Sequence, residues 1–254
     1  MPLTATSLSA TDPELVAIAD RFADDVERDA PLDPRLRGLL RVAAVVATGG
    51  TAVLRVELDD AIAAGVTPVE LKEVLYQAVP YAGLGRAVDA LVVANELLAD
   101  HDVELPLPGQ ATVTPATRAT DGLAVQMRIV GADAVDAMHA NAPADEQHVQ
   151  RALAAHCFGD HYTRGGLDVP TRELVTLALL VALGGADPQV AGHVRANLHV
   201  GNDRATLVAV LTQLLPVVGY PRTLNALRAL DDVAPYPTEP TPEPPTEPPT
   251  EEES

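Results

Sequence analysis

The side chains best suited to acid–base chemistry gather in one part of this sequence. Four of the seven histidines lie within residues 151–204, namely His156, His161, His193 and His199. Five arginines balance five aspartates and glutamates over the same range, so this stretch is formally neutral, whereas the whole chain of 254 residues carries a net charge of −19. An anionic ligand would therefore meet the least repulsion here.

Glu173 and His193 form the first candidate pair for catalysis. We expect two successive helices to carry them. A carboxylate in contact with an imidazole fixes the tautomer of the ring and suits it to proton transfer near neutral pH. The alternative is structural: Glu173 would stabilise the first turn of its helix, and His193 would be a partly buried polar group with its hydrogen bonds satisfied.

A second group of polar candidates follows in the segment FGDHYTRGGLD, residues 158–168. We predict a loop here, and loops carry binding residues more often than cores do. His161 and Arg164 are the candidates for contact with an anionic substrate. Tyr162 and Tyr81 are the further hydrogen-bond donors expected near such a site.

The elements that must position these side chains form an internal repeat. The stretch RGLLRVAAVVATGG (37–50) aligns with RELVTLALLVALGG (172–185), and AAGVTPVELKEVLYQAVPYAGLGRAVDAL (63–91) aligns with HVGNDRATLVAVLTQLLPVVGYPRTLNAL (199–227). The offset is 135 residues in the first alignment and 136 in the second. Matched glycines and prolines at a fixed spacing indicate duplication. The first copy has Gly38 and Glu57 where the second has Glu173 and His193, so it is the degenerate copy.

Each repeat reads as four helices, and no segment alternates with period two for long enough to make a strand. The fold class is therefore all-α. In the second copy we expect four helices. The first spans 171–183. The second has Asp187 as its N-cap and Pro188 in its first turn, and it ends at about residue 200. The third has Asp203 as its cap and ends at about residue 215, before Pro216, and the fourth spans 221–230. Further helices are expected over 13–29, 122–138 and 144–156.

Composition excludes several classes of function. Cys157 is the only cysteine, which rules out a disulfide framework, a Cys-rich zinc site and a CxxC pair within one chain. The acidic balance argues against nucleic acid as a partner, since phosphates require clustered Lys and Arg. The first residues lack the pattern of a signal peptide, and the apolar stretches are too short to span a bilayer. We expect a cytoplasmic protein with no membrane partner and no metal.

Residues 235–254 differ from the rest of the chain. They contain eight Pro and six Glu without Lys or Arg, a composition typical of a disordered acidic tail. We interpret the tail as a solubilising appendage, and the alternative is a docking segment for a protein partner. The predicted organisation is a first, degenerate helical unit over 1–110, a second unit with the site over 111–234, and the tail.

The second repeat resembles the carboxymuconolactone decarboxylase family, which includes the alkylhydroperoxidase D branch. The resemblance is carried by RGGLDVPTRELVTLALLVALGG (164–185), His193, Gly201 and LLPVVGYPRTLNAL (214–227), and more weakly by LRVAAVVATGG (40–50) and AAGVTPVELKEVLYQAVPYAGLG (63–85) of the first copy. It implies an all-helical, oligomeric protein without a cofactor. The peroxidase branch uses a CxxC pair shortly before the histidine, and ADPQVAG (186–192) contains no cysteine. Thiol peroxidase chemistry by that mechanism is therefore not expected.

The resemblance further implies a decarboxylase that removes CO₂ from a small carboxylated lactone in aromatic-acid breakdown. On that basis His193 would donate the proton, Glu173 would orient His193, and Arg164, with His161 and Tyr162, would bind the anionic substrate. Two alternatives stay open: a non-catalytic helical assembly or binding protein with a docking tail, and an alkylhydroperoxidase-like enzyme using Cys157. Single-unit relatives assemble as rings, so we expect a homotrimer or a dimer.

Overall fold

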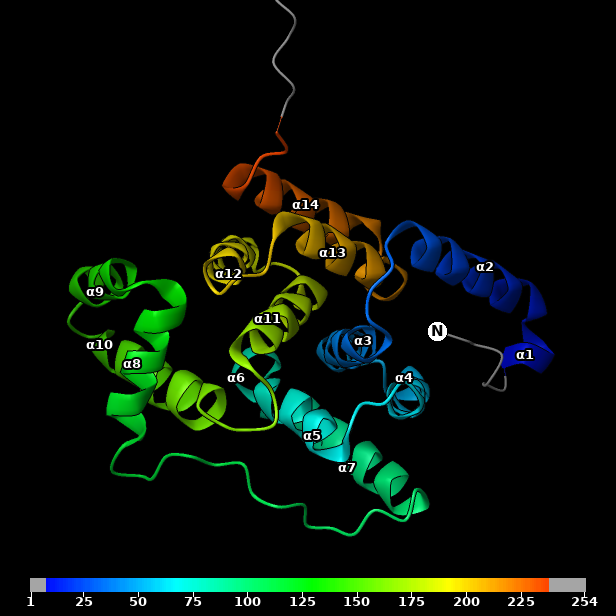
Figure 1. The fold of residues 1–254 in the computed structure, drawn as a ribbon, viewed down its shortest axis with the longest axis horizontal. Helices are drawn as coiled ribbons and strands as arrows, with labels where there is room; N and C mark the ends of the chain where they lie inside the picture. The colour runs from blue at the N-terminus through cyan, green and yellow to red at the C-terminus, as the bar shows by residue number, and fades with distance from the viewer. Residues whose placement is uncertain (1–7, 238–254) are drawn as a thin grey trace, which may run out of the picture.

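A computed structural model describes residues 8–237, and every regular element within that range is helical (Figure 1). The all-α fold class predicted from the sequence is confirmed. No helix in this range is both long and apolar enough to cross a membrane. All but the first three residues of the predicted tail, 235–254, lie outside the described part of the chain.

The two repeats are successive groups of helices, joined by a segment with helices of its own. The first group comprises α1 (Leu8–Thr11), α2 (Pro13–Asp29), α3 (Pro34–Thr48), α4 (Thr51–Ala63), α5 (Pro68–Gln77), α6 (Val79–Ala82) and α7 (Leu84–Asp100). The joining segment holds α8 (Arg118–Val130), α9 (Ala132–Asn141), α10 (Gln147–Ala152) and a π-helix (Leu153–Tyr162). The second group comprises α11 (Val169–Leu183), α12 (Asp187–His199), α13 (Arg204–Val218) and α14 (Tyr220–Val233).

The helix ends follow local sequence chemistry. The carboxylates of Asp33, Asp168 and Asp203 each accept a hydrogen bond from the backbone N–H three residues on, at 2.7–3.0 Å, and so cap α3, α11 and α13. Gly49 and Gly201 follow α3 and α12 with φ of 78° and 102°, a conformation that glycine adopts without steric cost. The predicted Asp203 cap is confirmed.

Two predicted helix ends are wrong. Asp187 is the first residue of α12 rather than its cap, and Ala186 occupies the cap position without a side-chain hydrogen bond. Helix α13 does not stop before Pro216 but continues to Val218. Pro216 removes one backbone donor, and the burial of Leu214 and Val218 on one face of α13 compensates for this loss.

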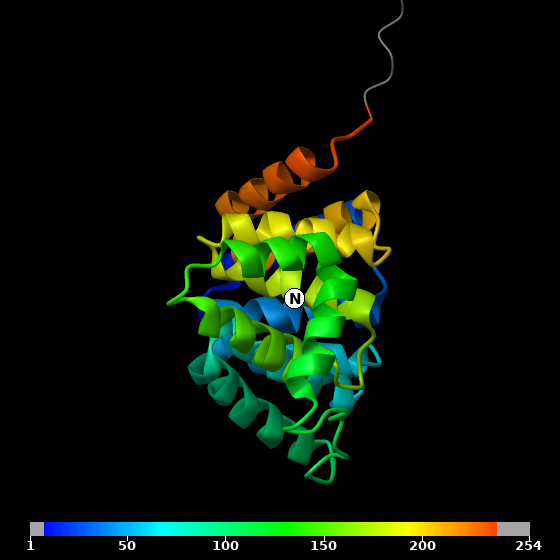
Figure 2. The same ribbon diagram turned by 90° about the vertical axis from the view of Figure 1, so that its left-hand side faces the viewer.

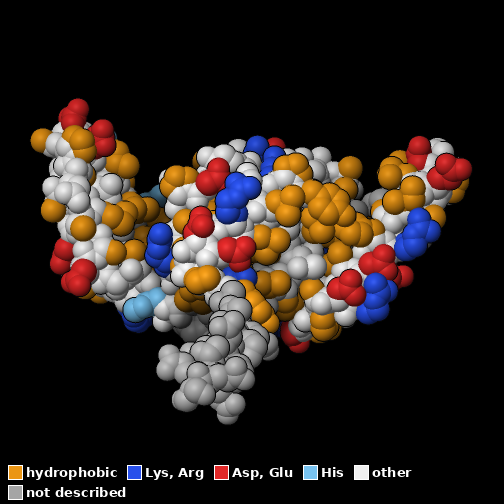
Figure 3. Space-filling view, turned by 90° about the horizontal axis from the view of Figure 1, so that it is seen from above, with side chains coloured by type: hydrophobic (Ala, Val, Ile, Leu, Met, Phe, Trp, Pro, Cys, Tyr) orange, Lys and Arg blue, Asp and Glu red, His pale blue; other side chains and the backbone are white. Residues whose placement is uncertain are grey.

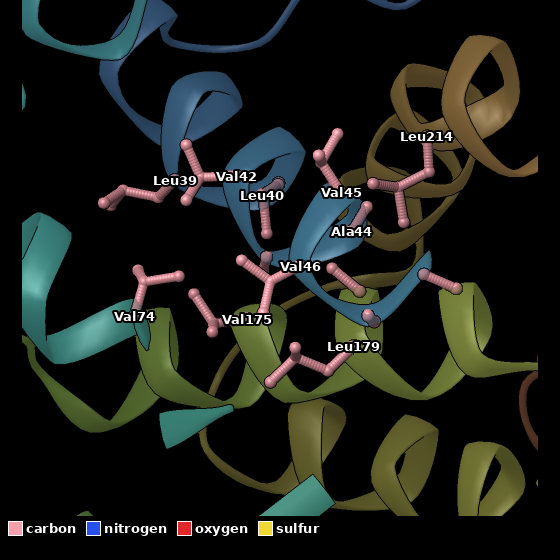
Figure 4. Close-up of a cluster of buried hydrophobic side chains, with 14 of the residues drawn as sticks. Leu39, Leu40, Val42, Ala44, Val45, Val46, Val74, Val175, Leu179 and Leu214 are labelled. Atoms are coloured by element: carbon pink, nitrogen blue, oxygen red, sulfur yellow. The ribbon is translucent and has the colours of Figure 1, made fainter. Parts of the chain in front are cut away.

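Helices α3 and α11, the matched helices of the two repeats, pack against each other at the centre of the molecule (Figure 1). Both helices are buried along most of their length, and their Val, Leu and Ala side chains belong to one continuous apolar cluster. Figure 4 shows Val46 of α3 close to Val175 and Leu179 of α11, with Val74 of α5 and Leu214 of α13 at the margins. One repeat therefore completes the core of the other.

The joining segment lies across one side of this body, with α8 packed against α12 and against the π-helix (Figure 2). The single helix predicted over 122–138 is wrong, because Gly131 (φ 98°) separates α8 from α9. The helix predicted over 144–156 is also shorter and less regular than expected: α10 ends at Ala152 and the π-helix follows directly.

The predicted loop at 158–168 begins later than expected, because its first five residues belong to the π-helix. The N–H of Thr163 closes the last turn on the carbonyl of Phe158, five residues back, at 3.2 Å. Packing accounts for this register: a Cβ atom on Gly122 of α8 would lie 2.1 Å from the carbonyl oxygen of Ala154, and one on Gly159 would lie 2.2 Å from that of Arg118. Only glycine permits α8 and the π-helix to cross so closely. The register of the π-helix turns the side chains of His161 and Tyr162 toward the interior.

Two groups of helices project from the body on opposite sides, α1 and α2 at one end and α8 to α10 at the other (Figure 1). The view from above shows the same two projections, with many Asp and Glu side chains on each (Figure 3). Much of the negative charge therefore lies on outer helices, away from the α3–α11 core.

Candidate active site

Glu173 of α11 and His193 of α12 are in direct contact. The Nδ1 atom of His193 lies 2.8 Å from Oε2 of Glu173, whose side chain is fully buried, while 17% of the His193 side chain is exposed. A carboxylate accepts hydrogen bonds, so Nδ1 carries the hydrogen and the opposite ring nitrogen, Nε2, is left for a ligand. The structure thus brings together the two residues predicted as the catalytic pair.

Tyr162 holds the other oxygen of the same carboxylate. Its hydroxyl donates a 2.6 Å hydrogen bond to Oε1 of Glu173 and lies 2.6 Å from the hydroxyl of Thr176. Burial raises the pKa of Tyr162 well above its ordinary value, and the nearby Glu173 adds to this shift. Tyr162 is 2% exposed, so it positions Glu173 rather than touching a ligand directly.

The hydrogen-bonded chain extends to Tyr81 and Cys157. The Tyr81 hydroxyl donates to that of Tyr162 at 3.3 Å, and Sγ of Cys157 lies 3.5 Å from the Tyr81 oxygen. The Tyr81 ring also meets the His193 ring edge to face, with centroids 5.8 Å apart. Tyr81 belongs to α6, so the first repeat contributes a wall to the site of the second.

The first repeat also supports the site through Gln77 of α5. The Gln77 amide donates to the Thr176 hydroxyl at 2.8 Å and to the carbonyl of Arg172 at 2.7 Å, and it accepts from the Arg172 guanidinium at 2.9 Å. Sequence reasoning missed this residue. The only sequence signal was that the repeat alignment matches Gln77 with another glutamine, Gln213. Both residues are buried in the structure.

The first repeat has no comparable pair at its own matched positions. Glu57, which corresponds to His193, is 1% exposed, and burial raises its pKa despite the opposing attraction of Arg41. Gly38, which corresponds to Glu173, has no room for a side chain, since a Cβ atom there would lie 3.0 Å from Ala61. The matched positions of the first repeat therefore hold no contact between a carboxylate and an imidazole.

His193 opens onto a cavity of about 550 Å³. The lining is mainly apolar and contains no Lys or Arg. It consists of Pro80, Tyr81, Gln126, Val130, Met138, Leu153, Cys157, Phe158, Leu180, Leu183, Ala186, Pro188, Gln189, Gly192, His193 and Ala196. A cavity of this size and character fits a small organic molecule.

Gln126 of α8 is a polar residue in this lining that sequence reasoning did not identify. It is 1% exposed, and its Oε1 atom has no hydrogen-bond partner among the described residues. A buried amide oxygen without a partner is costly and points to a missing partner. The only sequence signal was a glutamine within an otherwise amphipathic helix, and nothing in the repeat pattern pointed to it.

Arg164 and His161, which were predicted to contact the substrate together with His193, do not line this cavity. The Arg164 guanidinium is committed to Glu73, with Nε at 3.0 Å from both carboxylate oxygens and Nη2 at 2.8 Å from one of them. The π-helix, which the sequence did not predict, turns His161 into the interior instead.

His161 is not a source of positive charge at neutral pH. Burial lowers its pKa to about 4, and the neighbouring His156, whose ring centroid is 4.9 Å away, adds to the shift. Its Nδ1 atom has no partner among the described residues. A neutral imidazole of this kind contributes packing rather than anion binding.

Cys157 lies in the cavity wall but has the properties of a structural thiol. Burial raises its pKa to about 11, whereas reactive cysteines have lowered values. It is the only cysteine of the sequence, so no resolving thiol exists within the chain. Within residues 8–237 no cluster of three or more His, Cys, Asp and Glu side chains could hold a metal ion.

Comparison with known proteins gives two matches. The model of the carboxymuconolactone decarboxylase family matches residues 7–96 and, a second time, residues 147–232. The 4-carboxymuconolactone decarboxylase of Acinetobacter baylyi is 28% identical over 116 residues, which is 46% of this chain and 86% of that protein. Both Glu173 and His193 fall within the second matched range, whereas Gln126 lies between the two.

Proposed function

Since this chain belongs to the carboxymuconolactone decarboxylase family, we propose that it is a cofactor-independent decarboxylase acting on a small carboxylated lactone such as 4-carboxymuconolactone. The observation that carries this proposal is the contact between the buried Glu173 and His193, whose ring lines a mainly apolar cavity. The similarity to the Acinetobacter baylyi enzyme supports the choice of substrate.

The reaction requires only electron delocalisation and one proton. As the bond between the carboxylate and the ring breaks, CO₂ leaves, and its bonding electron pair moves into the conjugated lactone carbonyl to give a dienolate. A proton then adds to carbon and the product lactone forms. His193 supplies this proton through its ring nitrogen on the cavity side, while the carboxylate of Glu173 stabilises the ring that carries it.

The character of the cavity supports loss of CO₂. A substrate carboxylate placed among apolar side chains loses much of its hydration, and its charge becomes spread over the conjugated system as CO₂ departs. The absence of Lys and Arg from the lining keeps the carboxylate from being stabilised before it reacts. In this proposal the side-chain N–H of Gln126, a lining residue, donates to the lactone carbonyl, where negative charge develops.

The decisive experiment follows CO₂ release from 4-carboxymuconolactone by the full chain. We expect turnover by the unaltered protein and a loss of about a hundredfold or more in kcat for His193→Ala and Glu173→Gln, the effect usual for removal of an acid–base group. Arg195→Ala is the matched control, because Arg195 is exposed on the same helix as His193. Absence of turnover by the unaltered protein, or full turnover by a folded His193→Ala variant, would overturn the proposal.

A further inference from the structure

Arg164 lines a second cavity, separate from the one that His193 lines. It has a volume of about 370 Å³ and shares no lining residue with the His193 cavity. Its walls come from α5, from Asn95 of α7 and from the linker residues 105–110, which run along the α5 and α7 side of the molecule (Figure 1). The linker part of this wall, residues 105–110, lies outside both ranges matched by the family model.

The only lysine of the whole sequence, Lys72, faces this cavity. It is 8% exposed, and its ammonium group donates to Oδ1 of Asn95. No carboxylate among residues 8–237 lies within ion-pair distance of it. Burial lowers its pKa accordingly. A buried ammonium paired only with a neutral amide is a costly arrangement that an anion would relieve.

Arg164 brings a second cation to the same cavity. Its carboxylate partner, Glu73, is shared with the fully buried Arg172, which lies 2.9 Å from the second oxygen. One carboxylate therefore serves two guanidinium groups, and the Nη1 atom of Arg164 has no hydrogen bond to any described residue. The guanidinium also sits over the ring of Tyr76, 5.0 Å from its centroid.

The local charge is unusual for this protein. Lys72, Arg164 and Glu73 line the cavity, and the buried Arg172 pairs with Glu73 without lining it. These four side chains carry a formal charge of +2 in a chain of −19. The remaining lining is largely apolar, with Val69, Leu105 and Leu107 among its side chains. The second repeat has Val208 and Ala209 in place of Lys72 and Glu73, so this charge pattern belongs to the first repeat alone.

We propose that this cavity is a second ligand site, which binds a small organic carboxylate with an apolar or aromatic body. The carboxylate end would contact the Lys72 ammonium and the free edge of the Arg164 guanidinium, and the apolar end would pack against the linker. The site does no chemistry in this proposal, and it stands whether or not the His193 cavity decarboxylates lactones.

Binding of benzoate to the full chain, followed by isothermal titration calorimetry, tests the proposal, with the neutral isostere benzamide as the comparison ligand. We expect benzoate to bind at least about tenfold more tightly than benzamide, and Lys72→Met to remove that preference. His193→Ala, which alters only the other cavity, is expected to leave benzoate binding unchanged. Arg195→Met controls for the loss of one positive charge elsewhere on the surface.

The single lysine provides an independent readout. Acetylation of Lys72 by acetic anhydride, followed by mass spectrometry of the intact chain and its peptides, should slow several-fold in the presence of benzoate and not of benzamide. The proposal is overturned if benzoate leaves the acetylation rate unchanged, if folded Lys72→Met binds benzoate as tightly as the unaltered protein, or if His193→Ala abolishes binding. Lys72→Gln serves as a second variant should the methionine variant fail to fold.

Discussion

Gln77 in the first repeat donates a 2.8 Å hydrogen bond to the hydroxyl of Thr176 in the second repeat. Thr176 in turn contacts Tyr162, which holds one oxygen of Glu173 while His193 contacts the other. The orientation of the candidate proton donor therefore depends on a residue from the copy that has no Glu–His pair of its own. Side chains from both repeats therefore support the Glu173–His193 contact.

Replacing Gln77 by methionine tests this dependence. The change removes one of the two hydrogen bonds of the Thr176 hydroxyl and leaves the Nη1 atom of Arg172 without its partner. We therefore expect a loss of about 1–3 kcal/mol in the free energy of unfolding and about a tenfold lower kcat. Gln213→Met is the matched control: Gln213 occupies the equivalent buried position and bonds Ala30 and Arg41 instead. Equal losses of activity in the two variants would argue against a specific role for Gln77.

Tyr162→Phe removes the hydroxyl that holds Glu173 and retains the buried ring. Because Tyr162 is behind Glu173 and does not line the cavity, we expect kcat to fall by about tenfold or more, with little change in KM. Steady-state kinetics on 4-carboxymuconolactone separate the two constants. A rise in KM at constant kcat would instead indicate that Tyr162 touches the substrate, the role predicted from the sequence.

Gln126→Leu tests the unpartnered amide in the cavity wall. The substitution preserves volume and removes both hydrogen-bonding atoms, so stability should rise or stay constant, since Oε1 loses no partner among the described residues. Activity should fall at least about tenfold in kcat/KM if the amide contacts the lactone. Thermal unfolding and kinetics measured on one preparation distinguish this outcome from that of a merely structural glutamine, whose removal would lower stability without a matching loss of activity.

Cys157 is expected to be unreactive in the folded protein. With its pKa raised to about 11, its thiolate fraction at pH 8 is more than about a hundredfold lower than that of a free cysteine. Alkylation by iodoacetamide, followed by mass spectrometry, should be correspondingly slow and should accelerate when urea unfolds the chain. Rapid alkylation of the folded protein, together with turnover of a hydroperoxide, would favour the antioxidant function instead.

His161 should make the folded state sensitive to acid. Its pKa is about 4 when folded and about 6.5 when unfolded, so between these values the unfolded chain binds more protons and stability falls as the pH falls. The loss from this residue amounts to about 3 kcal/mol on going from pH 7 to pH 4. Urea unfolding across this range should show a smaller loss for His161→Phe than for the unaltered protein. His199→Gln, which removes an exposed histidine elsewhere in the chain, is the matched control.

The sequence by itself determined the duplicated helical architecture and the site pair. Matched glycines and prolines mark helix ends, which depend on local backbone geometry, and they therefore show in the sequence. Glu173 and His193 could be paired because successive antiparallel helices bring such positions together. The helix through Pro216 and the π-helix at Leu153–Tyr162 could not be foreseen, since packing decided both against the local preference.

Only the tertiary structure decided which side chains share a cavity. Arg164 lies two residues after the π-helix. Its guanidinium nevertheless binds Glu73 of the first repeat and does not line the His193 cavity. Gln77 and Gln126 enter the site from segments far away in the sequence. Such neighbours are set by the packing of α3 against α11 and of α8 against the π-helix, contacts between distant residues that spacing along one chain does not encode.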